Sequence, residues 1–122
     1  MQTLVALGAI MMFLAVALGA FGAHALKNIL VGEKLKTYQT GIQYHIAHGL
    51  GLILLGIIAD QSAHASLVVT AGWFLLAGII LFSGSLYALS LTGIRKLGAI
   101  TPLGGICFLT GWAILLIAIL QG

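Results

Sequence analysis

The sequence predicts an all-α membrane protein in which four transmembrane helices form a glycine-rich bundle. Of its 122 residues, 61% are apolar and only 6% are charged, and the mean hydropathy is +1.22. A soluble domain carries about 25% charged residues, so a surface this apolar is suited to lipid rather than to water. Four apolar segments, each near the ~20 residues that cross a bilayer, fill most of the chain. The length permits a single transmembrane domain, residues 1–122.

The first predicted helix covers residues 3–24. Its apolar run ends in small residues, as a signal peptide does, but a positively charged start is missing, so we expect it to be retained as a helix. Small residues share one stripe at the helical period, where close helix packing would need them: Gly8, Met12, Ala15, Gly19 and Ala23. Packing within the monomer is favoured over dimerisation, although glycine stripes alone do not separate the two.

The second predicted helix crosses the membrane over residues 41–59 and begins near Glu33, in the cytoplasmic interface. Leu35, Tyr38 and Ile42 already follow helical spacing there, and an acidic residue suits the positive end of a helix. An inward face contains Tyr38, Gly41, His45, His48, Leu52 and Gly56, and a lipid face contains Ile46, Leu50, Ile53 and Ile57. Gln39 and Gln43 fall on the other side, at headgroup level. Polar side chains in a bilayer turn toward protein, so both histidines are predicted to point inward.

The third and fourth predicted helices cover residues 67–91 and 102–120. Ser83, Tyr87 and Ser90 share one stripe of the third helix. Thr101 followed by Pro102 is typical of an N-cap and a first helical position. Small residues form a packing stripe on the fourth helix: Gly104, Cys107, Gly111 and Ala118. The lone cysteine is interpreted as a small core side chain.

The five cations predict the orientation. Lys27, Lys34 and Lys36 lie in the first connection and Arg95 and Lys96 in the third, whereas the other exposed segments have none. Cations gather on the cytoplasmic side, so loops 25–40 and 92–101 are predicted to be cytoplasmic and both termini extracytoplasmic. The net charge of +3 therefore reports orientation and does not indicate nucleic-acid binding.

Seven polar residues are predicted to gather near the cytoplasmic ends of the helices and to form a pocket: His24, Tyr44, His45, His48, Tyr87, Ser90 and Thr101. His24 lies off the small-residue stripe of its helix, so a groove or the lipid headgroups are the alternative surroundings for it. His64, in the second connection with Asp60, is interpreted as a solvated loop residue.

Several stretches resemble one known family. "GAFGAHALK", "YQTGIQYHIAHGLGLILLGI", "GIILFSGSLYALSLTGIRKLGAITPLGG" and "FLTGW" resemble the domain of unknown function 423, a family of small YgdD-like bacterial membrane proteins. The resemblance covers nearly the whole chain and implies a multi-helix protein of the bacterial plasma membrane, with no established activity. The family's motifs fall on Gly19, Gly22, His24, Gln43, Tyr44, His45, His48, Gly84, Ser85, Tyr87, Thr101, Pro102 and Gly105.

Four classes of function suit such a pocket to different degrees. The favoured class is non-enzymatic: interhelical hydrogen bonds between the pocket residues fix the helices. The protein then contributes to membrane homeostasis or acts as an accessory subunit. Its expected partners are the lipid bilayer, a second copy of itself in a homo-oligomer, or a larger membrane complex. A bound lipid, metal or haem is the first alternative, with His24, His45 and His48 as weak metal candidates that no carboxylate or thiolate joins. Transport of a proton or small solute by an oligomer is the second. Catalysis is least favoured, with a quinone- or lipid-modifying activity as the exception, because Ser83 and Ser90 have no nearby acid.

Overall fold

The computed structural model describes all residues, Met1–Gly122, and every regular element in it is helical. The elements are α1 (Gln2–His24), α2 (Glu33–Gln61), α3 (Ala65–Gly78), a π-helical turn η1 (Ile79–Ser83), α4 (Gly84–Thr92), a 3₁₀ turn η2 (Arg95–Ala99) and α5 (Thr101–Gln121). Because α3, η1 and α4 are continuous, and η2 leads into α5, four helical stretches are long and apolar enough to cross a membrane. The predicted four-helix membrane fold is confirmed.

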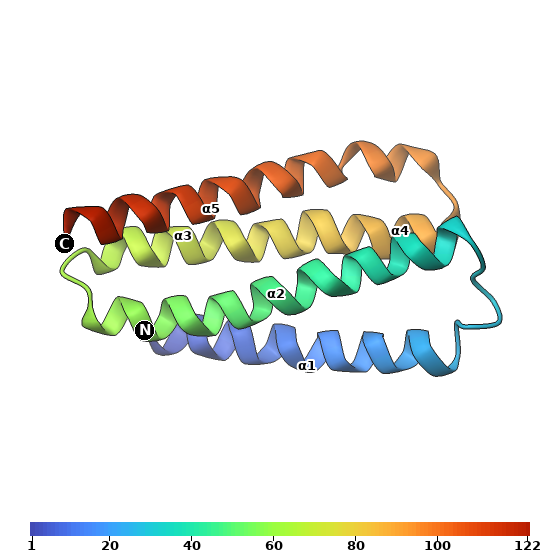
Figure 1. Cartoon of the computed structure of the whole chain (residues 1–122), viewed down its shortest axis with the longest axis horizontal. Helices are drawn as coiled ribbons and strands as arrows, with labels where there is room; N and C mark the ends of the chain where they lie inside the picture. Colours follow the sequence, from blue (N-terminus) through green and yellow to red (C-terminus); the bar gives the residue numbers. More distant parts are fainter.

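The helices lie side by side in chain order, which makes the bundle an open one (Figure 1). The broad contacts join α1 to α2, α2 to α3 and α4, and α3 to α5, whereas α1 and α5 lie at opposite sides of the row. Both termini lie at one end of the molecule, and the connections that carry the cations lie at the other (Figure 1). Large apolar side chains cover the outer surface, among them Phe13, Leu109 and Leu120.

Glycines set the close approach of neighbouring helices. A Cβ on Gly8 would lie 2.9 Å from the carbonyl oxygen of Gly49 on α2, and one on Gly56 would lie 2.9 Å from the backbone nitrogen of Val5 on α1. Because these neighbours are backbone atoms, they cannot rotate away as a side chain would. Ile53, expected to face lipid, is instead half-buried against Gly8.

The packing stripe of α1 differs in part from the predicted one. Gly8 and Ala15 are buried, but a Cβ on Gly19 would have only Ile42 near it, at 3.8 Å, and Ala23 is exposed. Gly22 makes the close contact instead, against the ring of Tyr38. The buried positions advance by seven residues, from Gly8 to Ala15 to Gly22, which is two helical turns at each step.

The third membrane-spanning helix contains a π-helical turn that the hydropathy pattern did not predict. Within η1 the amide of Gly84 donates to the carbonyl of Ile79, five residues back, so one turn is wider than in an α-helix. Phe82 lies in this turn, and its backbone lies directly against Gly104 of α5. On α5, Gly111 packs in the same way against Leu75 and the backbone of α3.

The junctions at the cation-bearing end use two glycines in the left-handed region. Gly32 (φ +61°) precedes α2, and Gly93 (φ +73°) ends α4, where its amide donates to the carbonyl of Leu89 over 2.8 Å. Glycine adopts this conformation without the steric cost that a Cβ brings. The predicted N-cap role of Thr101 is wrong: Thr101 is already the first residue of α5, its side chain makes no capping bond, and Pro102 is the second.

Candidate functional site

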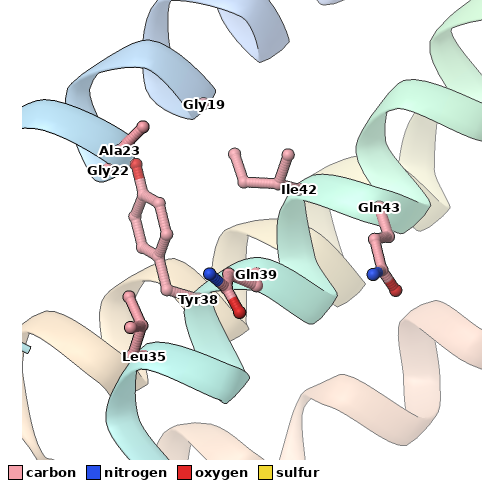
Figure 2. A pocket seen from close by; sticks show the side chains of 8 residues that line it. All are labelled: Gly19, Gly22, Ala23, Leu35, Tyr38, Gln39, Ile42 and Gln43. Carbon is pink, nitrogen blue, oxygen red and sulfur yellow. The ribbon is translucent and has the colours of Figure 1, made fainter. Parts of the chain in front are cut away.

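Tyr38 connects the start of α2 to the end of α1. It is 2% exposed, and its hydroxyl donates to the carbonyl of Leu18 over 2.5 Å. Figure 2 shows the phenol ring pointing at α1, where it ends beside Gly22 and Ala23. Beyond the ring, a groove of about 420 Å³ lies between the two helices, with Gln39 and Gln43 among its lining residues. Gly22 is needed here because the ring occupies the space that any side chain would take.

His45 forms the centre of a buried polar cluster between α1, α2 and α4. Its Nδ1 atom lies 2.8 Å from the hydroxyl of Tyr87, in agreement with the predicted meeting of these two residues. Ser83, from the π-helical turn, is fully buried and donates to the carbonyl of Gly41 over 2.7 Å. The Nε2 atom of His45 is buried without a hydrogen-bond partner. The cluster therefore joins α4 and the π-helical turn to α2 through two interhelical hydrogen bonds.

His48 belongs to a second cluster, on the α5 side of α2. The indole Nε1 of Trp112 can only donate, so it fixes His48 Nε2, 3.0 Å away, as an acceptor. The proton is then on Nδ1, which donates to the carbonyl of Tyr44 over 2.7 Å. The imidazole also stacks on Phe108, with ring centroids 3.6 Å apart. Both nitrogens and one ring face are thus occupied by the protein itself.

Around His48 the aromatic rings form a groove that opens on the outer surface. Tyr44 packs against Phe82 with centroids 4.5 Å apart, and Phe82 lies 5.5 Å from Phe108. The groove has a volume of about 530 Å³ and is bounded on α5 by residues between Pro102 and Trp112. Tyr44 is 43% exposed and Trp112 39% exposed, so the mouth of the groove faces the surroundings of the helices. We call this feature the aromatic groove; its lining residues are Tyr44, His48, Phe82, Pro102, Gly105, Ile106, Phe108, Leu109 and Trp112.

The single pocket predicted from the sequence is wrong in its membership. His24 is exposed at the end of α1 and is not a hydrogen-bond partner of either of the other two histidines. Ser90 is buried but donates to the carbonyl of Tyr87 within its own helix. Thr101 lies 2.6 Å from the hydroxyl of Ser85 and joins α5 to α4. The predicted residues therefore belong to separate small contacts rather than to one cavity.

The two histidines also diverge, although three residues separate them. Residues three positions apart in the sequence lie about 60° apart around a helix. On α2 this angle directs His45 toward Tyr87 of α4 and His48 toward Trp112 of α5. For both to bind one metal ion or haem, His48 would have to give up the bond from Trp112. The chain contains no group of three or more His, Cys, Asp or Glu side chains that could hold a metal ion together.

Three aromatic residues around His48 were not among the sequence-predicted site residues: Phe82, Phe108 and Trp112. All are apolar aromatics within apolar segments, and nothing in their spacing separates them from ordinary lipid-facing side chains. Trp112 carries the one usable signal, because an indole N–H at membrane depth needs an acceptor. The sequence offers few acceptors at that depth, and His48 is one of them.

Comparison with known proteins identifies relatives along almost the full length. Residues 18–105 match the family described as "Protein of unknown function (DUF423)". The UPF0382 membrane protein YwdK of Bacillus subtilis (strain 168) is 50% identical over 118 residues, which cover 97% of this chain and 96% of that protein. The UPF0382 membrane protein SH2409 of Staphylococcus haemolyticus (strain JCSC1435) is 45% identical, over 97% of this chain and 95% of the relative. No solved structure matches the chain.

Proposed function

Since the chain belongs to the DUF423 family of membrane proteins of unknown function, we propose that it is a non-enzymatic, multi-pass protein of the bacterial plasma membrane that holds a lipid chain in its aromatic groove. In this role it contributes to membrane homeostasis or serves as an accessory subunit. The two polar clusters fix the helices so that the groove keeps its shape.

The observation that carries the proposal is the aromatic groove itself. It is apolar over most of its lining, it has a volume of about 530 Å³, and it opens between exposed apolar side chains of α5 such as Ile106 and Leu109. At membrane depth the surrounding solvent consists of lipid chains, so a groove of this kind takes up a chain rather than water. Rigid aromatic walls give a chain more dispersion contacts than neighbouring lipids do.

The positions of the acids and histidines support a non-enzymatic role. Glu33 and Asp60 lie at opposite ends of α2, about 40 Å apart at 1.5 Å per residue. His48 has both nitrogens engaged, and His45 contacts a tyrosine rather than a carboxylate. General acid–base catalysis needs a titrating group within reach of a substrate proton. His45 lines neither groove, and His48 lines only the largely apolar aromatic groove, where both of its nitrogens are already engaged.

A groove-filling substitution tests the proposal. Gly105 lines the aromatic groove, and a Cβ there would lie 4.0 Å from the nearest atom of Phe82, so Gly105→Leu enters the groove without a backbone clash. We expect the variant to bind copurifying phospholipid about tenfold more weakly than the wild type does. This corresponds to a loss of about 1.4 kcal/mol of binding free energy. Native mass spectrometry in a mild detergent measures the bound lipid.

Gly84→Leu is the matched control, because a Cβ at Gly84 meets nothing within 4 Å and the residue does not line the groove. It should keep the wild-type amount of lipid at equal thermal stability. Equal lipid retention by wild type and Gly105→Leu would contradict the proposed function.

We also propose that both termini are extracytoplasmic and that the connections 25–32 and 93–100 face the cytoplasm. The five cations lie at or beside the ends of the helices that meet these connections, and the opposite end has none. In a Cys107→Ser background, a cysteine at Lys34 should react with a membrane-impermeant maleimide only after the cells are permeabilised, whereas one at Ser66 should react with intact cells or spheroplasts. The reverse pattern would invert the orientation.

A further inference from the structure

The start of α2 and the end of α4 enclose a second, polar hollow of about 290 Å³ at the cation-bearing end. We propose that this cationic hollow binds the phosphate diester of a phospholipid headgroup. Its polar and backbone lining comes from Glu33, Lys34, Thr37, Ser90, Gly93 and Arg95. The site is separate from the aromatic groove, and the inference does not depend on that groove.

Two cations from distant parts of the sequence, Lys34 and Arg95, line the hollow, and neither forms a salt bridge. Lys34 lies in the first turn of α2, and Arg95 begins the 3₁₀ turn after α4. The ammonium group of Lys34 lies beside Gly93, with Nζ 3.9 Å from the position that a Cβ would take there. The one ion pair of the protein involves Asp60 and the amino group of Met1, at the opposite end. The hollow therefore holds two cations against the single carboxylate of Glu33, an excess of one positive charge. An anion is the ligand that this arrangement favours.

Uncommitted hydrogen-bond donors accompany the charges. The first backbone bond of α2 runs from the amide of Lys36 to the carbonyl of Gly32, so the amides of Glu33, Lys34 and Leu35 have no backbone acceptor. No side chain caps this end. The hydroxyl of Thr37 has no partner either, whereas that of Ser90 already donates to the carbonyl of Tyr87. Phosphate oxygens accept hydrogen bonds from donors of these kinds.

The remaining lining favours a diester over free phosphate. Glu33 contributes one carboxylate to the hollow. Its negative charge repels a doubly charged phosphate ion more strongly than it repels a singly charged phosphate diester. Leu89 supplies an apolar wall, and the exposed Leu91 follows on the same helix. The hollow also lies at the end of the apolar spans, where lipid headgroups are found. These features fit a phosphate that is attached to lipid chains.

The test compares two double variants of equal charge. The full-length protein, Lys34→Gln/Arg95→Gln and the control Lys27→Gln/Lys96→Gln are purified in an uncharged detergent and titrated with phosphatidylglycerol. Lys27 and Lys96 are exposed and do not line the hollow. Each cation near a headgroup contributes about a fivefold effect. We therefore expect the first variant to bind phosphatidylglycerol roughly 25-fold more weakly than the wild type, and the control to bind within about fivefold of the wild type. Native mass spectrometry counts the bound lipid.

Two further measurements identify the ligand and exclude misfolding. Glu33→Gln should strengthen the binding of phosphatidylglycerol, a gain of function that an unfolded protein would not give. Excess inorganic phosphate should leave the bound lipid in place. The proposal is overturned if both double variants lose equal affinity, which indicates diffuse attraction, or if inorganic phosphate displaces the lipid, which indicates a site for free phosphate.

Discussion

Replacing Gly104 by valine is expected to abolish the native packing of α5. A Cβ at this position would lie 2.6 Å from the Cα of Phe82 and closer still to its backbone nitrogen. The backbone there belongs to η1, which the buried bond from Ser83 to Gly41 holds against α2. Since neither helix can yield locally, the cost should exceed the 1–3 kcal/mol that is usual for overpacking. A thermal-unfolding experiment in detergent should show a large loss of stability, or no folded protein at all.

Gly105→Ala is the control for this prediction. The two glycines are adjacent and share the same helical backbone, but a Cβ at Gly105 would stay 4.0 Å from its nearest neighbour. Helix propensity alone favours alanine over glycine by about 1 kcal/mol. The control should therefore be as stable as the wild type or more so. Equal melting temperatures for Gly104→Val and the wild type would show that α5 does not lie against the π-helical turn.

Phe108→Ala is expected to produce the second large effect. The ring is 4% exposed, stacks on the imidazole of His48 and fills the space beside Gly78. Truncating a buried phenylalanine usually costs about 3–5 kcal/mol through lost contacts and the cavity that remains. Here the change also removes a wall of the aromatic groove. We expect a strongly lowered unfolding temperature, and a change in Trp112 fluorescence in a Trp73→Phe background, because the Trp112 side chain contacts the same imidazole.

The neighbouring residue provides the comparison. Leu109 is 72% exposed and faces outward, so Leu109→Ala should change the free energy of unfolding by less than about 0.5 kcal/mol. If Leu109→Ala proved as damaging as Phe108→Ala, the rotation of α5 about its axis would have to differ from the one described.

The sequence predicted the features that depend on the surrounding solvent, such as the membrane spans, and those that belong to a single helix, such as its buried face. Apolar length alone predicted four membrane-crossing helices, since backbone groups in lipid must bond within their own segment. The 3.6-residue period correctly placed His45 and His48 on the buried side of α2. It also placed Tyr87 where it meets His45.

The features that were missed depend on which neighbour each face meets. Periodicity gives the angle of a side chain around its own axis, but not the order of the helices. One pocket was therefore expected where His45 and His48 contact different helices, and His24 was included although it is exposed. Gly22, rather than Gly19, accommodates the ring of Tyr38, a choice that depends on a side chain of another helix. The π-helical turn carries no Pro or other breaker that would have marked it in the sequence.

The open row of helices also bears on how the chain reaches its native state. Nearly every extensive contact joins consecutive membrane-crossing helices, and none of comparable extent joins the first to the last. Contacts of this kind close short loops, so little chain entropy is lost before each one forms. Each helix that enters the bilayer during synthesis finds its principal neighbour already in place. The topology therefore allows the helices to assemble in the order of translation, with one helix–helix interface forming after another.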